Sequence, residues 1–325
     1  MYNNGVITRK GNIYVDLALG SNPACSMNKG LRLLFFGNYF VGFLAIAFNL
    51  EAAAQLHMPH NSLLYYALLF MLPIIYYTYA YQHQSIDPVK ADPRSLWYTK
   101  HRRFVQYSQA IMIGLSAIIS VVLFASYSNR LLHLPFIYWI FLAVILITAT
   151  LYYGLLPGGL NLRNVGWLKA FVIGFVWACC ANLAPMMMTH VETGNAYPDS
   201  ILWIFLFVKN WMFCTVNAIM FDIKDYPSDA NRQLKTFAVR FGLRRTIFFI
   251  LIPLLAIGLI SLICFALYRG LLPVQILINC IPFLLMLYVV YTMRKRHSLV
   301  YYLILIDGAL LVKAICGIVA MTFAR

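Results

Sequence analysis

The sequence predicts an all-α integral membrane protein in which nine transmembrane helices are bundled around a central apolar cavity. Hydrophobic residues make up 62% of the 325 residues and charged residues only 11%, against about 25% charged in a soluble domain. Apolar runs recur along the whole chain, and each is close to the ~20 residues that a spanning helix requires. The basic residues gather in alternate connections between these runs, which is typical of a multi-pass membrane protein.

The apolar runs define the expected spans. Their boundaries are 31–50, 62–82, 104–126, 134–156, 166–189, 199–221, 246–268, 271–293 and 299–323. No change in composition separates soluble domains, so we expect residues 1–325 to form a single polytopic membrane domain. Residues 1–30 are a polar segment and do not have the pattern of a cleavable signal peptide.

The basic residues predict the orientation in the membrane. All but five of the 25 lie in the N-terminal segment or around the connections that follow the second, fourth, sixth and eighth runs; the exceptions are Arg130, Lys209, Arg269, Lys313 and Arg325. Because cytoplasmic connections are enriched in Lys and Arg, we expect the N-terminus and the long connections 83–103 and 222–245 to be cytoplasmic. We expect a bacterial inner-membrane protein whose active-site loops are these two connections.

The formal net charge of +15 also raises the question of nucleic-acid binding. The basic residues are scattered among short connections and do not form one patch or stripe. We therefore attribute the charge to orientation in a lipid bilayer, to which attraction for anionic lipid adds, and expect no nucleic-acid partner. The oligomeric state is left open.

Three of the ten acidic residues stand together at the end of the sixth run. Asp222, Asp225 and Asp229 follow one another at i, i+3 and i+7, a spacing that places them on one face of a helix end. Carboxylates this close repel each other unless a cation holds them, and sets of carboxylate oxygens suit Mg²⁺. The three residues are therefore candidate metal ligands, and the alternative is a solvated acidic connection.

This stretch resembles a motif of a known family. Asp222, Asp225 and Asp229, with Lys235-Thr236 and Gly242 after them, resemble the second aspartate-rich motif of the UbiA-type intramembrane prenyltransferases. That motif reads DxxDxxxD, followed by Lys-Thr or Arg-Thr and then Gly. The resemblance implies nine transmembrane helices, a Mg²⁺ cofactor, an isoprenoid diphosphate substrate and a second, unidentified acceptor substrate.

The first aspartate motif of the same family is altered in this chain. The family pattern is roughly NxxxDxxxD, and here His83 stands in place of Asn, Asp87 matches, and Ala91 stands in place of the second Asp with Asp92 beside it. The resemblance implies that Asp87 and Asp92 bind a second Mg²⁺ and that His83 contacts the metal or the substrate. The alternative is an ordinary polar connection with a degenerate motif.

Several basic residues are candidate partners of the diphosphate. Lys169 opens the fifth apolar run, where the family has a Lys that faces the diphosphate; snorkelling to the membrane interface is the alternative. Arg102 and Arg103 precede the third run and could clamp a diphosphate, or anchor that helix at the membrane surface. Lys224, within the second aspartate motif, and Lys235, which follows it, complete the set.

Polar residues inside the spans are the remaining candidates. Asn38 on the first span could contact substrate, and Asn217, five residues before Asp222, could orient the carboxylates. For both, hydrogen bonding between helices is an equal alternative. Lys209 and Lys313 lie inside spans and require partners elsewhere in the chain.

The leading functional hypothesis is Mg²⁺-dependent transfer of a prenyl group from a polyprenyl diphosphate to an aromatic or other small nucleophile within the membrane. A second hypothesis keeps the substrate class but makes the enzyme an intramembrane terpene cyclase, which would form its product without an acceptor. The third is a non-catalytic protein that binds or transports a lipid or metabolite, with the intramembrane Asp307, Lys209 and Lys313 as a relay. Diphosphate release separates the first two hypotheses from the third.

Overall fold

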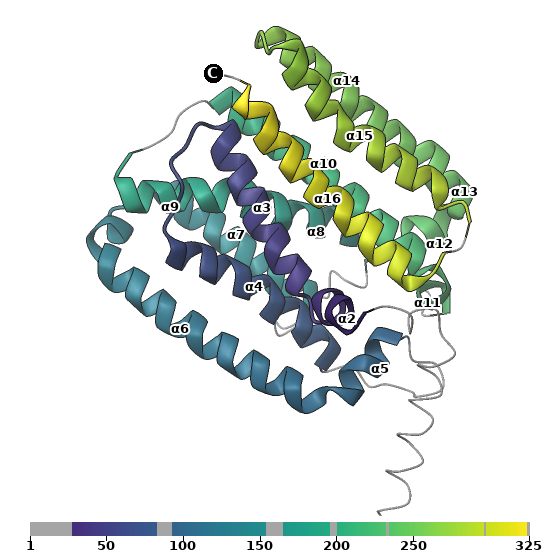
Figure 1. Ribbon diagram of the computed structural model, residues 1–325, viewed down its shortest axis with the longest axis horizontal. Helices are drawn as coiled ribbons and strands as arrows, with labels where there is room; N and C mark the ends of the chain where they lie inside the picture. The colour runs from purple at the N-terminus through teal and green to yellow at the C-terminus, as the bar shows by residue number, and fades with distance from the viewer. Residues whose placement is uncertain are drawn as a thin grey trace, which may run out of the picture. The chain divides into compact units, whose positions relative to one another are not determined.

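A computed structural model of the chain describes residues 28–82, 93–153, 165–195, 200–231, 234–295 and 297–323. The regular elements in these residues are helices (Figure 1). Contacts along the chain divide it into two compact units. The first comprises Met1–Phe43, Leu63–Ala125 and Ser298–Val300, and the second comprises Leu44–Ser62, Ser126–His297 and Tyr301–Arg325.

Six helical runs in the described residues are long and apolar enough to cross a membrane: Arg102–Leu132 (α6), Gly166–Thr193 (α8, η3 and α9), Ser200–Lys224 (α10), Leu243–Tyr268 (α13, η4 and α14), Pro273–Thr292 (α15) and Leu299–Thr322 (α16). The bent pair α2 and α3 makes a seventh if it counts as one span. Shorter apolar stretches, Leu63–Tyr79 in α4 and Phe136–Tyr152 in α7, occupy the places of the expected second and fourth spans. The protein is thus all-helical and multi-pass, while the count of nine spans and the central cavity stay predictions.

The first unit contains α2 (Lys29–Phe36), the start of α3 (Tyr39–Gln55), α4 (Leu63–Gln82), α5 (Pro93–Lys100) and α6 as far as Ala125. Its described core joins Met71 and Ile74 of α4 to Met112 of α6. The axis of the chain turns by 64° between α2 and α3. Asn38 makes this bend with a φ of +64°, a left-handed conformation that Asn tolerates better than most residues.

The second unit contains the end of α3 and a series of helices from α7 onward. Their bounds are Phe136–Tyr153 (α7), Gly166–Ala178 (α8), Cys179–Leu183 (η3), Ala184–Thr193 (α9), Ser200–Lys224 (α10), Tyr226–Asn231 (α11), Phe237–Phe241 (α12), Leu243–Arg245 (α13), Thr246–Leu251 (η4), Ile252–Tyr268 (α14), Pro273–Thr292 (α15) and Leu299–Thr322 (α16, in this unit from Tyr301). The segments η3 and η4 are π-helical turns within longer helical runs.

The pair α8 and α10 forms the closest helix contact in this unit. Gly174 on α8 faces Thr215 on α10, and a Cβ at Gly174 would overlap the Thr215 side chain. Trp211 adds a hydrogen bond from its Nε1 to the Phe171 carbonyl at 3.0 Å. Small residues let membrane helices approach until backbone and side chain touch, so this pair is a firm frame for the groups it carries.

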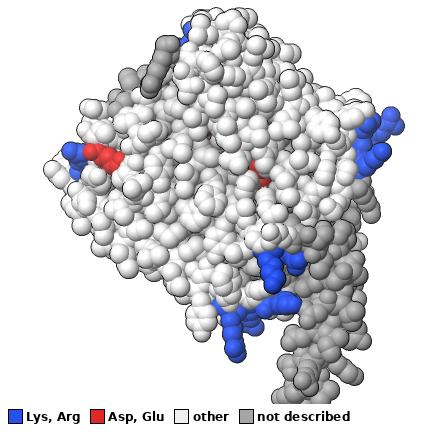
Figure 2. All heavy atoms as spheres, viewed as in Figure 1, with Lys and Arg blue, Asp and Glu red and all other residues white. Residues whose placement is uncertain are grey.

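The helices α14 and α15 form a hairpin, and they run side by side in Figure 1. Gly270 lies in the turn between them with a φ of +66°, a left-handed conformation that favours glycine. Outward-facing positions elsewhere are strongly apolar: on α6, Tyr107, Ile118 and Val121 are each more than 60% exposed. On the face shown in Figure 2, charged residues occupy only small patches, as lipid contact requires.

Two stretches that the sequence assigns to connections contain helices. Residues 93–100 form α5, and 222–245 holds the end of α10 and the short helices α11 to α13. The sixth span continues to Lys224 because Asp222 and Ile223 are both buried and extend its packed face. Asp222 therefore belongs to the last turn of a helix, where its backbone is fixed.

Candidate active site

Lys169 and Asp222 form the centre of the candidate site. Lys169 lies in the first turn of α8 and Asp222 in the last turn of α10, and the Lys169 Nζ lies 2.6 Å from Asp222 Oδ1. The exposed fraction of the Asp222 side chain is 1% and that of Lys169 is 16%. The two residues that the sequence places on separate helices thus form a nearly buried ion pair.

The other two carboxylates of the motif differ in exposure. Asp225 is 44% exposed and pairs with Lys224 at 2.8 Å. Asp229 is buried in α11, and its charge interacts favourably with Lys169 and unfavourably with Asp222. The start of α8, the end of α10 and α11 therefore bring three acids and two lysines into one electrostatic neighbourhood.

The donor set suits Mg²⁺ in its chemistry. All three predicted ligands are carboxylates, and Asp222 Oδ2 is a buried oxygen to which no described residue donates a hydrogen bond. In the part of the chain that the structure describes, no group of three or more His, Cys, Asp or Glu side chains is gathered closely enough to hold a metal ion. The assignment of Asp222, Asp225 and Asp229 as metal ligands therefore stays a prediction.

The Lys235-Thr236 segment braces the start of α8. A Cβ at Gly166 would overlap the backbone of Lys235 and Thr236, so the glycine allows this segment to lie directly against the helix that carries Lys169. Thr236 is fully buried and caps α12, accepting a hydrogen bond from Val239 N at 3.4 Å. Lys235 itself is exposed, as a residue available to an anionic ligand must be.

Gly166→Ala is expected to displace this brace and to lower both the unfolding temperature and the rate of diphosphate release. The methyl group would meet backbone atoms, which cannot move aside as a flexible side chain can. Gly308→Ala is the matched control, since a Cβ on Gly308 in α16 meets nothing within 4 Å. Equal unfolding temperatures and rates for both variants would contradict the brace.

Asn217 and Asn38 both make contacts between elements. Asn217 Nδ2 donates to the Ile306 carbonyl of α16 at 3.1 Å. Asn38 donates to Thr78 Oγ1 at 3.0 Å and to the Tyr98 hydroxyl at 3.1 Å, and accepts a hydrogen bond from Arg94. These contacts match the alternative of inter-element hydrogen bonding. Contact of Asn38 with substrate and a role of Asn217 at the carboxylates stay predictions.

The Tyr98 hydroxyl completes the Asn38 cluster. It donates to the Phe36 carbonyl at 2.9 Å, at the end of α2. Burial raises the pKa of Tyr98, and the nearby Arg94 guanidinium offsets only part of that effect. The hydroxyl therefore keeps its proton, and the cluster holds the bend between α2 and α3.

The remaining predicted residues belong to the first aspartate motif and the following basic run. His83, Asp87 and Asp92 lie outside the described residues. Arg102 and Arg103 are exposed at the start of α6 in the first unit. Their predicted contacts with metal and diphosphate stay predictions.

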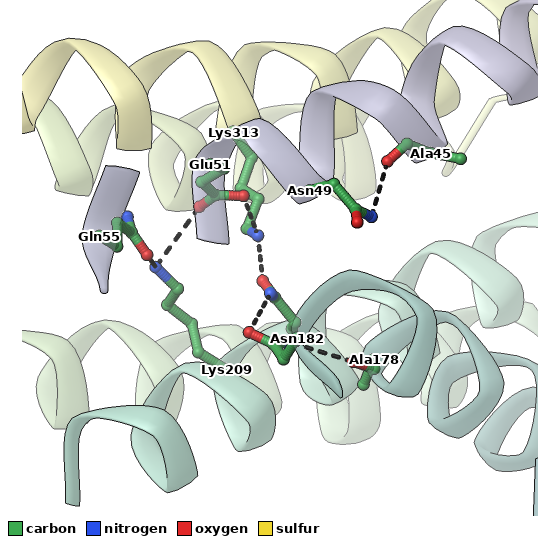
Figure 3. Close-up of polar contacts among 9 residues, drawn as sticks. Ala45, Asn49, Glu51, Gln55, Ala178, Asn182, Lys209 and Lys313 are labelled. Carbon is green, nitrogen blue, oxygen red and sulfur yellow. Dashed lines mark hydrogen bonds and ion pairs between the residues drawn. The ribbon is translucent and has the colours of Figure 1, made fainter. Parts of the chain in front are cut away.

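The second unit contains a buried charged cluster that the sequence does not predict. Lys313 Nζ lies 2.6 Å from Glu51 Oε2 and donates to Asn210, while Lys209 Nζ lies 3.6 Å from Glu51 Oε1 and donates to Gln55 Oε1 at 3.2 Å (Figure 3). The expected first span ended at residue 50, so Glu51 was placed in a connection. Lys209 and Lys313 lie within apolar runs of the sequence, and two such lysines indicate that a buried acid pairs with them.

The cluster also bears on the transport hypothesis. That hypothesis used Lys209 and Lys313 as members of a relay, and in the structure both are side-chain partners of Glu51. Lys313 in addition lies 4.6 Å from the centre of the Phe48 ring. Internal pairing thus accounts for their presence in the membrane.

Comparison with known proteins identifies the family. A sequence profile described as the UbiA prenyltransferase family matches residues 102–300, which is more than half of the chain and includes Lys169 and the Asp222 to Asp229 motif. No curated protein and no solved structure matches the chain. The matched range, the aspartate motif and the helical membrane fold agree, and the protein is a transferase that belongs to the UbiA prenyltransferase family.

Proposed function

We propose that the protein transfers a prenyl group from a polyprenyl diphosphate to a small nucleophilic acceptor within the membrane, with Mg²⁺ held by Asp222, Asp225 and Asp229. Family membership implies the prenyl transfer and the diphosphate donor. The nine-helix arrangement, the metal ligands and the diphosphate contacts are the further content of the proposal. We assign Lys169, Lys224 and Lys235 to the diphosphate.

The Lys169–Asp222 pair is the observation that carries the proposal. Asp222 Oδ1 is paired with the Lys169 ammonium group, whereas the buried Oδ2 has no hydrogen-bond partner among the described residues. The carboxylate can therefore still bind a cation. A buried ammonium group next to it has capacity for an anion. Metal and diphosphate supply these two charges together, so the pair suits a metal diphosphate better than either ion alone.

The residues of the chain have distinct tasks in the reaction. Lys169 donates to a phosphate oxygen and keeps positive charge beside the leaving group. The bond between C1 of the prenyl group and oxygen breaks, and its electron pair leaves with the diphosphate. The acceptor nucleophile bonds to C1 and releases its proton to solvent, which balances charge and atoms. Bound Mg²⁺ would neutralise the charge that develops on the diphosphate.

The first aspartate motif extends the proposal to the other long connection. We assign Asp87 and Asp92 to a second metal ion, and His83, Arg102 and Arg103 to substrate contacts. These assignments rest on the family resemblance and on residue type. They are tested separately from those of the second motif.

The test is diphosphate release by the purified protein from geranyl, farnesyl and longer prenyl diphosphates, with and without Mg²⁺. Release is expected to require Mg²⁺, and Asp225→Ala is expected to lower it about 100-fold because a metal ligand is removed. Asp87→Ala measured in parallel shows whether the altered first motif contributes. Asp16→Asn is the control for loss of an acid outside both motifs.

Each outcome separates the hypotheses. Release that requires an added acceptor supports transfer, whereas product from diphosphate alone supports the terpene cyclase. No release from any donor would contradict both reactions. A full effect of Asp225→Ala with no effect of Asp87→Ala would limit the metal site to the second motif.

A further inference from the structure

The contact between Asn182 and Asn210 lies on the same helix pair as Lys169 and Asp222. Asn182 belongs to η3, which continues α8, and Asn210 belongs to α10. Asn210 Nδ2 donates to Asn182 Oδ1 at 3.2 Å, and both side chains are at least 97% buried. These two side-chain contacts lie at two levels of the antiparallel interface, in addition to the hydrogen bonds that Trp203 and Trp211 of α10 donate to carbonyls of the facing helix.

The spacing of the two contacts agrees on both helices because of the π turn. Thirteen steps lead from Lys169 to Asn182, but only twelve from Asn210 to Asp222. The Ala184 N–H bonds to the Cys179 carbonyl, five residues back, so this turn holds one residue more than an α turn. Part of this widened turn lies between Lys169 and Asn182, so the thirteen steps rise less than thirteen α-helical steps would and come closer to the roughly 18 Å of the twelve steps on α10.

The π turn is held in place from two neighbouring helices. Asn49 on α3 donates to the Cys180 carbonyl at 3.0 Å, and Trp203 on α10 donates through Nε1 to the Asn182 carbonyl at 3.3 Å. These bonds occupy carbonyls of the widened turn. The π turn is therefore stabilised by hydrogen bonds from α3 and α10 to its own carbonyls.

Asn210 is fixed by the charged cluster on its other side. Its Oδ1 accepts from Lys313, which is paired with Glu51 (Figure 3). Gly317, one turn after Lys313, leaves the space that Glu51 occupies, since a Cβ there would lie 2.5 Å from Glu51 Oε1. The amide orientation of Asn210 is thus determined by an ion pair, and its N–H₂ group is directed to Asn182.

We propose that the Asn182–Asn210 contact is a positioning device for Lys169: it fixes the axial register of α8 against α10 and so holds the Lys169 ammonium group at Asp222. The proposal rests on the proposed function in one respect, namely that Lys169 contacts the diphosphate. A displacement of about 1 Å at a positioning group can cost up to 100-fold in rate. A slip of one residue along a helix is about 1.5 Å.

The first test is Asn182→Leu, which keeps the size of the side chain and removes both of its hydrogen bonds, the one from Asn210 and the one to the Ala178 carbonyl of its own helix. The kcat/KM for the prenyl diphosphate is expected to fall about 10-fold. Asn279→Leu is the matched control, because the Asn279 amide bonds only within its own helix, to the Gln275 carbonyl at 2.9 Å, among the contacts described for it. Asn182→Ala serves as a second variant if leucine lowers the yield of folded protein.

A double-mutant cycle distinguishes positioning from general damage. If Asn182 acts through Lys169, Asn182→Leu has no further effect on the residual rate of Lys169→Met. An equal 10-fold loss in both backgrounds overturns the proposal. The proposal is also overturned if Asn279→Leu lowers kcat/KM as much as Asn182→Leu does.

The same four proteins are also compared by their thermal unfolding temperatures, a measurement that requires no substrate. The shifts in unfolding temperature of Asn182→Leu and Lys169→Met are expected to be non-additive in the double variant, although the sites are about 18 Å apart. Additive shifts overturn the register proposal even if the enzyme is active. If the wild-type protein releases no diphosphate, the proposed function fails, and the unfolding cycle still decides the register.

Discussion

Asp222→Asn is expected to lower diphosphate release by about 100-fold or more. The neutral amide of Asn cannot bind a cation as the Asp222 carboxylate does. Removing one preorganised electrostatic group from an active site lowers the rate by about two to three orders of magnitude. The same change leaves Lys169 with no ion-pair partner at 2.6 Å. Because breaking a buried pair costs about 3 kcal/mol, the unfolding temperature is expected to fall as well.

The double variant Asp222→Asn/Lys169→Met separates the two effects. With both charges removed, no ammonium group is left buried without a partner, and the unfolding temperature is expected to return close to that of the wild-type protein. The rate of diphosphate release stays low. Recovery of activity together with stability would contradict the assignment of Asp222 to the reaction.

Glu51→Gln is expected to lower the free energy of unfolding by about 3–5 kcal/mol. Glu51 is the acid between two buried lysines, and without it Lys209 and Lys313 repel each other with no compensating charge in the cluster. Denaturant unfolding of the protein in one fixed detergent measures the change. The effect does not require substrate, because it concerns the helix bundle.

Lys209→Met is the matched comparison, and its effect is expected to be below about 1 kcal/mol. Lys209 is the second cation on a single acid, and its removal leaves the closer Glu51–Lys313 pair balanced. Glu51→Gln/Lys313→Gln keeps the net charge of the cluster and is expected to recover most of the stability. A loss for Lys209→Met as large as that for Glu51→Gln would show that the three charges are not arranged as one pair and a surplus cation.

Much of the fold could be predicted because the bilayer imposes a length on every span. Apolar runs of about 20 residues appear in the structure as helices at the expected places, and the tight turn at Arg269-Gly270 follows from residue type. The ends of helices were less predictable. α6 runs to Leu132 and α10 to Lys224, because helices continue beyond the apolar run wherever polar side chains find partners or water.

The candidate site was predictable where its residues share a local pattern. The spacing of Asp222, Asp225 and Asp229 identifies them as candidate ligands. The family resemblance adds Lys169, which forms an ion pair with Asp222 in the structure. Glu51 has no such pattern: its partner is 262 residues away, and nothing near it in the chain marks the pairing. The extra residue of η3 was equally hidden, since Cys179–Leu183 is as apolar as an ordinary span.

The separation of Glu51 from Lys313 also has a consequence for synthesis of the chain. Glu51 in α3 precedes Lys313 in α16 by 262 residues, so it leaves the ribosome and enters the membrane well before its closest partner is made. An acid without a partner costs up to about 2.5–3.5 kcal/mol at the centre of a membrane helix and less towards an end, and Glu51 lies in the C-terminal part of α3. Lys209 is made earlier than Lys313 and can shield the carboxylate in the meantime. Lys209, the second cation beside Glu51 in the finished bundle, can thus serve as a temporary counter-ion during assembly, and a chain that stops before α16 lacks the Glu51–Lys313 ion pair.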